Sequence, residues 1–248
     1  MLYAVEDRPA AFEGRAAPKR QPLPESLTDP TATCALITPG RVGLSVGRLA
    51  YLPICARAEP IRLILHYTGL PYEMSYVPFA EWPQAEPSTP MELLHPTFTT
   101  MGGDVIRDEI LIAKYICGMA NMPGLMPGNN DDCAEQLYAI CSQPPLSTLD
   151  ALTNGLSTMD VGEQQEELLA ACATALNKIW LDFMGNTPFS GGDAPSYGEF
   201  ALMHVMLSLR KADATSVSSL GERCMAWFDR MCALPRIERY LKSRSWSI

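Results

Sequence analysis

The spacing of apolar residues changes part-way along this chain, and the change predicts two kinds of structure. Between residues 44 and 120, short apolar runs alternate with helical patterns. One helical segment has Pro60 in its first turn and a stop signal at Gly69. The predicted elements are, in order, a strand at 45–53, a helix at 59–69, a strand at 72–77, a hairpin at 97–108 and a helix at 108–119.

The remainder of the chain is predicted to be helical. Residues 121–132, NMPGLMPGNNDD, have the prolines, glycines and asparagines of a linker. In the region 133–248, the stretch EFALMHVMLSL is apolar on all sides, which is typical of a helix at the centre of a bundle. Ser196 and Glu199 predict a capping box at its start. The pattern therefore predicts an α/β domain of the thioredoxin type at 44–120, followed by an all-α domain.

Residues 1–43 differ from both of these regions. They hold 6 of the 21 prolines, balanced charges and no helical or strand periodicity. We interpret them as an extended arm rather than a domain, and one possible use of such an arm is attachment to a partner.

Composition narrows the classes of function. Apolar residues make up 47% of the 248 residues and charged residues 19%, as in globular proteins. The net charge of −9 argues against a nucleic-acid partner, and no apolar run reaches the roughly 18 residues of a membrane span. The eight cysteines are scattered without a CxxC pair, which predicts an intracellular, reducing compartment, cytoplasmic or organellar, and neither disulfides nor a metal site.

Four stretches resemble the cytosolic glutathione S-transferases, nearest the tyrosine-type classes alpha, mu, pi and sigma. They are YLPICARAEPIRLIL with GLPYE, EWP with PSTP, FSGGDAPSYGEFAL, and ALPRIERYLKSR. Their order and spacing match the family over about 200 residues, from Leu44 to the end. The resemblance implies the glutathione-transferase fold, a thioredoxin-like domain followed by a helical bundle, with glutathione as co-substrate and no other cofactor.

The resemblance also implies how the thiol would be activated. Tyr51, at the end of the first strand, matches the tyrosine that donates a hydrogen bond to the glutathione sulfur. Such a bond favours the thiolate, which is the nucleophile. Arg57 matches an arginine that in some classes adds a positive field near the same sulfur.

Three further residues match positions that hold glutathione in the family. Pro96 matches the cis-proline whose preceding residue, here His95, offers backbone hydrogen bonds to the cysteinyl part of the ligand. A trans Pro96 would remove this backbone site. Trp82 matches a tryptophan that lines the site, although core packing explains it equally well, and Glu86 replaces the lysine usual nearby.

The expected glutamyl-binding position departs most from the family. Asp108 and Glu109 stand where the family has a Gln-Ser pair that binds the γ-glutamyl group at a helix N-terminus. Two like charges ~4 Å apart at an effective dielectric of ~20 repel by about 4 kcal/mol. We therefore expect a weakened glutathione site.

Cys55 offers a different chemistry. It falls where the omega class and the glutaredoxins carry a nucleophilic cysteine at a helix N-terminus, so a redox role is possible, although a packed and inert thiol is favoured because Tyr51 is also present. His66 and His204 lie in helical, apolar stretches and are interpreted as hydrogen-bonded core residues rather than ligands.

Two functions remain open. The first is an enzyme that adds glutathione to a small electrophile through Tyr51 and Arg57. The second is a non-catalytic subunit or binding module with the same fold, which forms a homodimer or joins a larger assembly through residues 1–43.

Overall fold

The structure, a computed structural model, describes residues 45–77, 95–128, 131–154, 163–185 and 187–244. All of these residues belong to one unit, residues 35–248. Its elements are β1 (Gly47–Tyr51), α1 (Glu59–Thr68), β2 (Glu73–Tyr76), β3 (Thr97–Thr100), β4 (Val105–Ile106), α2 (Glu109–Ala120), α3 (Asp131–Cys141), α4 (Leu146–Thr153), α5 (Glu163–Phe183), α6 (Tyr197–Ala212), α7 (Ala214–Ser218), α8 (Glu222–Cys232) and α9 (Pro235–Ser243). None of the helices in these ranges is long and apolar enough to cross a lipid bilayer.

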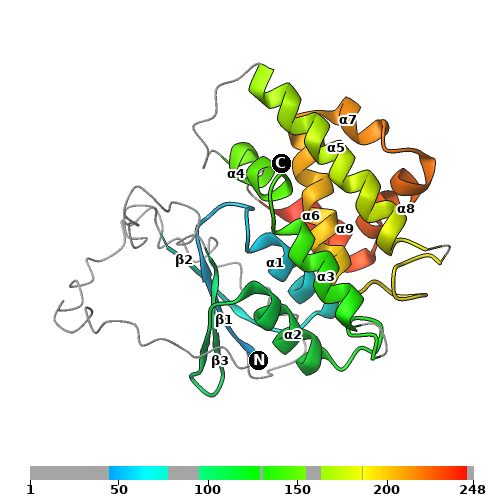
Figure 1. The fold of residues 1–248 in the computed structure, drawn as a ribbon. Helices are drawn as coiled ribbons and strands as arrows, with labels where there is room; N and C mark the ends of the chain where they lie inside the picture. Colours follow the sequence, from blue (N-terminus) through cyan, green and yellow to red (C-terminus); the bar gives the residue numbers. More distant parts are fainter. Residues whose placement is uncertain (1–44, 78–94, 129–130, 155–162, 186, 245–248) are drawn as a thin grey trace, which may run out of the picture. The chain divides into compact units, whose positions relative to one another are not determined.

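Four strands form one mixed sheet in the order β2-β1-β3-β4. β1 pairs in parallel with β2 and antiparallel with β3, and β3 pairs antiparallel with β4. Leu49 of β1 lies opposite Phe98 of β3, and both side chains are fully buried. The predicted mixed sheet is therefore confirmed, and α1 and α2 lie beside it in Figure 1.

Local signals in the sequence fix several helix ends. Gly69 ends α1 in the left-handed conformation, with φ of 69°, which a residue with a side chain adopts at a cost. Pro144 and Pro145 separate α3 from α4, as predicted. The predicted capping box of α6 is also present, and the Ser196 N–H donates to the Glu199 carboxylate over 2.9 Å.

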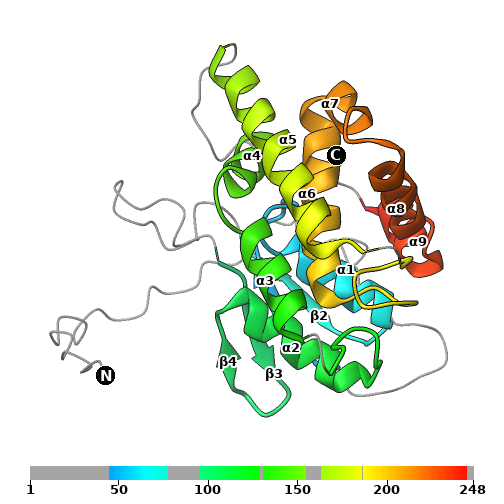
Figure 2. The same ribbon diagram turned by 45° about the vertical axis from the view of Figure 1, so that its right-hand side comes forward.

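Helix α6 is the centre of the helical half. Every residue from Tyr197 to Leu209 is buried, as expected for a helix that is apolar on all sides. Gly198 allows α3 to approach closely, because a Cβ atom there would lie 2.3 Å from the carbonyl oxygen of Ala134. Figure 2 shows α3 and α5 beside α6. The structure confirms a thioredoxin-like domain followed by an all-helical domain.

A buried carboxylate joins α1 to the C-terminal helix. Glu59 is fully buried and accepts hydrogen bonds from Arg62 at 3.0 Å, Tyr240 at 2.9 Å and Arg244 at 2.8 Å. Arg62 also donates to the backbone oxygens of Leu52 at 3.3 Å and Ile54 at 2.7 Å. The network therefore fixes the segment between β1 and α1 as well as the contact between α1 and α9.

We expect the Glu59→Gln variant to lose about 3–5 kcal/mol of unfolding free energy, because it leaves two buried guanidinium groups without their carboxylate. Urea unfolding followed by circular dichroism measures this loss. Glu238→Gln is the matched control, since it removes a carboxylate from an exposed pair with Lys242 on α9 and should leave stability unchanged. Equal effects of the two substitutions would contradict the role assigned to Glu59.

Candidate functional site

Tyr51 lies at the end of β1 and is fully buried. It packs with Leu52, Ala56 and Ala58, and the Arg62 guanidinium lies 5.8 Å from its ring centroid. Burial raises the pKa of the Tyr51 hydroxyl well above its usual value, which the Arg62 charge only partly offsets. The hydroxyl therefore keeps its proton and can act only as a neutral hydrogen-bond donor or acceptor.

Three of the residues singled out in the sequence meet in one cluster. Arg57 Nη1 donates to Glu109 Oε1 over 3.2 Å, and His95 Nδ1 lies 2.9 Å from the same oxygen. Arg57 Nη1 and His95 Nδ1 are 3.1 Å apart. The Glu109 side chain is only 8% exposed and that of Arg57 19%, so solvent screens this ion pair weakly. The charge of Arg57 is therefore largely neutralised within the protein.

The two adjacent acidic residues have different roles. Asp108 is the N-cap of α2, and its side chain accepts a hydrogen bond from the Leu111 N–H over 2.9 Å. Glu109, in the first turn, turns inward to Arg57. Only the second carboxylate of the pair therefore enters the cluster.

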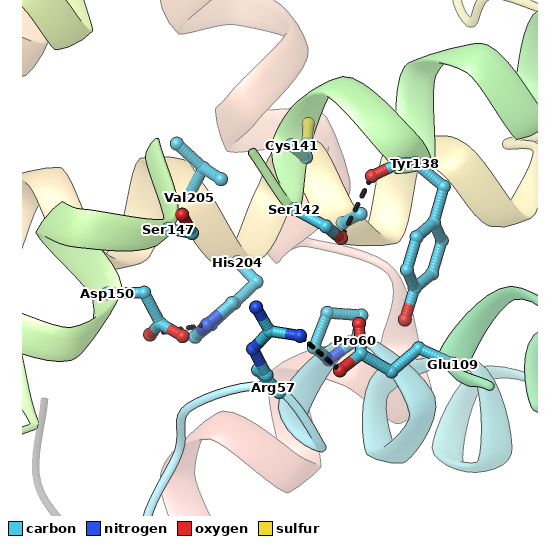
Figure 3. Close-up of a pocket in the computed structure, with 11 residues that line it drawn as sticks. Arg57, Pro60, Glu109, Tyr138, Cys141, Ser142, Ser147, Asp150, His204 and Val205 are labelled. Carbon is cyan, nitrogen blue, oxygen red and sulfur yellow. Dashed lines mark hydrogen bonds and ion pairs between the residues drawn. The ribbon is translucent and has the colours of Figure 1, made fainter. Parts of the chain in front are cut away.

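A small cavity lies beside the cluster, between α1 and the helices α3, α4 and α6 (Figure 3). Its volume is about 20 Å³, which is room for about one water molecule. Arg57 and Glu109 line one side, and Tyr138, Asp150 and His204 line the other. This cavity holds neither a tripeptide nor an electrophile in the conformation described here.

The far wall carries a second buried ion pair. His204 Nε2 on α6 lies 2.8 Å from Asp150 Oδ1 on α4. Burial lowers the pKa of His204, but Asp150 outweighs this effect and the net shift is upward. The prediction that His204 is a hydrogen-bonded core residue is confirmed. The sequence analysis did not single out Asp150. The signal that could have found it is an acidic residue within the apolar stretch LSTLDAL.

Comparison with known proteins shows which family this chain is similar to. The model of the glutathione S-transferase C-terminal domain matches residues 157–244. Hematopoietic prostaglandin D synthase of Gallus gallus is 25% identical over 201 residues, which cover 79% of this chain and 96% of that protein. The class-mu 28 kDa glutathione S-transferase isozyme of Schistosoma japonicum is 30% identical over 111 residues, which cover 40% of this chain and 54% of that protein. The solved structure of NaGST-2 matches the fold with a TM-score of 0.67 at 20% identity, covering 81% of this chain and 98% of that one.

Residues 157–244 thus match the C-terminal domain of the glutathione S-transferases, and the chain is similar in sequence and in fold to proteins of that family.

The prediction of a cis Pro96, made from the transferase resemblance, is wrong. Among the described residues the cis peptide bond is the one between Pro144 and Pro145, and the His95–Pro96 bond is not cis. An X-Pro bond prefers trans by about 0.5–1 kcal/mol unless its surroundings require cis, and no local signal in this chain supported that requirement. Pro96 therefore lacks the cis geometry that the transferase resemblance predicts.

Cys55 does not have the surroundings that a transferase or glutaredoxin nucleophile needs. Its side chain is 7% exposed, and burial raises the pKa of its thiol to about 12. The charge of Glu59 adds to the increase, while Arg244 and Arg62 oppose it. A protonated, buried thiol is a poor nucleophile, which favours the interpretation of Cys55 as an inert packed residue.

The remaining expected residue of the transferase site, Trp82, lies outside the described residues, as do Glu86 and the arm at 1–43. The seven cysteines that the structure describes are free thiols.

The Asp150–His204 pair predicts a pH dependence of stability. Because the pKa of His204 is raised on folding, its contribution is complete below the unfolded value of about 6.5 and is lost as pH rises through the folded value. We expect the unfolding free energy of the native protein, relative to that of His204→Gln, to fall as the pH rises above about 6.5. Each unit by which folding raises the pKa of His204 adds about 1.4 kcal/mol to the unfolding free energy at low pH.

Urea unfolding of both proteins across this pH range measures the difference. The comparison also removes the opposite effect of His66, whose pKa burial lowers to about 4. Asp150→Asn should abolish the same pH dependence. If the difference in unfolding free energy between the native protein and His204→Gln stays constant or grows as the pH rises, the Asp150–His204 pair is not its source.

Proposed function

We propose that this chain is a glutathione S-transferase-like protein with a weakened glutathione site, because one of its own carboxylates occupies the charged centre of that site. The contact of Glu109 with both Arg57 and His95 carries this proposal. In the family, the position of Glu109 receives the γ-glutamyl group of glutathione, so an internal carboxylate there repels the carboxylate of the ligand.

The same contact weakens activation of the thiol. Arg57 is expected to add a positive field near the glutathione sulfur, but the Glu109 carboxylate 3.2 Å away cancels most of that field. Tyr51, the expected donor to the sulfur, has no exposed surface in this conformation. Both groups that would favour the thiolate are therefore engaged within the protein, and conjugation requires the cluster to open.

Among smaller effects, the backbone N–H of Arg57 lowers the pKa of the Tyr51 hydroxyl, which supports a position of that hydroxyl near the start of α1. This is the place from which the family's tyrosine reaches the sulfur. Catalysis through Tyr51 is therefore available to the chain once the cluster opens, and it is slow while Glu109 holds Arg57.

We expect the native protein to bind glutathione with a dissociation constant well into the millimolar range. Glu109→Gln removes the repelling charge and releases Arg57, so affinity should improve by about 1–2 kcal/mol, roughly 5- to 30-fold, after allowance for solvent screening. Isothermal titration calorimetry with reduced glutathione measures both values.

Asp108→Asn is the matched control, because it removes an equal charge next to the site yet keeps a capping side chain for α2. Its effect on affinity should be smaller. In the Glu109→Gln background, Tyr51→Phe should abolish most conjugation of glutathione to an aryl halide while affinity stays nearly constant. Tight binding by the native protein would overturn the proposal, and so would an unchanged affinity in Glu109→Gln.

A second candidate is a non-catalytic subunit. The observation that favours it is a set of exposed large apolar side chains on the β3–β4 turn, the edge strand β4 and helix α2: Met101, Val105, Leu111 and Met119, which are 52%, 48%, 58% and 47% exposed. An exposed apolar edge strand favours association. We propose a second copy of this chain as the partner at this surface.

We expect the native protein to be a dimer and Leu111→Lys to be a monomer, because a buried lysine at the interface lacks a partner for its charge. Size-exclusion chromatography with light scattering measures the mass. Leu181→Lys is the control, since Leu181 is 83% exposed but lies on α5, away from this surface, and should leave the dimer intact. A monomeric native protein, or a dimeric Leu111→Lys, would exclude this interface.

A further inference from the structure

A buried hydroxyl group lies beside the cluster of Arg57, His95 and Glu109. It belongs to Tyr138 on α3, and among the residues that the structure describes it has no hydrogen-bond partner. Buried polar groups are nearly always paired, because an unpaired one has lost its bonds to water without replacement. The Tyr138 hydroxyl therefore destabilises the conformation described here, and a partner in a second conformation would account for it.

Tyr138 borders the same small cavity as the cluster. Tyr138, Arg57 and Glu109 all line this cavity, which has room for about one water molecule. Figure 3 shows the hydroxyl end of Tyr138 pointing toward the side chain of Glu109. A carboxylate oxygen is similar in size to a water molecule, so the cavity gives the Glu109 carboxylate room to turn toward Tyr138.

The charges of the cluster act on Tyr138. Burial raises the pKa of its hydroxyl well above the usual value, and the negative charge of Glu109 is the next largest cause of the increase. The positive charge of Arg57 opposes it. The hydroxyl keeps its proton and remains a donor, which is the partner that a carboxylate needs.

Tyr138 is held in place, whereas the Glu109 carboxylate can turn. The Tyr138 ring packs against that of Tyr197 on α6, with the centroids 6.3 Å apart, and its backbone oxygen accepts a hydrogen bond from Ser142 Oγ over 3.1 Å. The contacts of Glu109 with Arg57 and His95 both go through Oε1. A turn of the carboxylate therefore breaks both contacts together.

We propose that Tyr138 is a positioning residue for the open form of the cluster, in which its hydroxyl donates to the Glu109 carboxylate that has left Arg57. The inference rests on the proposed function, in which conjugation requires the cluster to open. Arg57 is then available to the ligand, and the carboxylate is held by a neutral donor instead of being left unpaired in a buried place. Glu109 thus alternates between two partners, a guanidinium and a phenol.

The rate at which phenylglyoxal modifies Arg57 measures this opening, because a guanidinium held in an ion pair reacts slowly with that reagent. Mass spectrometry of the peptides gives the rate without glutathione. We expect Tyr138→Phe to slow the modification of Arg57 about fivefold or more, since the open form loses a hydrogen bond to a charged group. In the Glu109→Ala background, Arg57 should react faster than in the native protein, and Tyr138→Phe should change the rate by less than about twofold, because no carboxylate is there to receive the bond.

Tyr197→Phe is the matched control. It removes the same hydroxyl from a buried tyrosine that packs against Tyr138 but is not among the residues that line the cavity, so the rate at Arg57 should stay unchanged. Urea unfolding should show that Tyr138→Phe is at least as stable as the native protein, because the closed form loses no hydrogen bond of that hydroxyl.

An unchanged rate at Arg57 in Tyr138→Phe would overturn the inference, and so would equal rates in Tyr138→Phe and Tyr197→Phe. An equal loss in the native and Glu109→Ala backgrounds would show that the hydroxyl acts without Glu109, and a marked loss of stability in Tyr138→Phe would show that it has a partner in the closed form. Either result would also overturn the inference. The proposed function is tested separately, by the glutathione affinity of Glu109→Gln, so the two can fail independently.

Discussion

The buried carboxylate of Glu59 is the contact on which the rest of this structure depends. A fully buried charge is unfavourable unless its partners surround it, and Glu59 receives donors from its own helix and from the C-terminal helix α9. Through Arg62, the same network holds the backbone oxygens of Leu52 and Ile54. The segment between β1 and α1 cannot move freely while this network is intact, so the positions of Tyr51 and Arg57 follow from it.

Because Arg57 is held in place, the net charge around its guanidinium depends strongly on the side chain at position 109. A guanidinium held at the start of α1 has few ways to avoid a neighbouring carboxylate, and Glu109 reaches it from the first turn of α2. The resemblance to the transferases leads us to expect a cationic Arg57, whereas in this structure the Glu109 carboxylate lies beside Arg57 and offsets its charge. Under our proposal, this one acidic residue makes the expected cationic centre a neutral pair.

The sequence predicted the parts of the fold that local patterns determine. Each of these patterns depends on residues within one turn or one strand. They are the strand and helix periodicities, the end of α1 at Gly69, the break at Pro144–Pro145 and the capping box at Ser196. The contacts that decide the site are long-range. Glu59 and Arg244 are 185 residues apart, and Arg57 and Glu109 are 52 apart. A sequence gives the identity of such residues but not which way their side chains turn, and for that reason the separate roles of Asp108 and Glu109 could not be foreseen.

Arg57 and Arg230, which lies on α8, differ in what holds their guanidinium groups. Arg57 is held by a carboxylate, which fixes its position and neutralises its charge together. Arg230 is held by a backbone oxygen, which fixes its position while its charge stays available. A carbonyl group carries no net charge, so a guanidinium bound to it keeps its positive charge. Within the described residues, the charge of Arg57 is therefore offset by the group that holds it, whereas that of Arg230 is not.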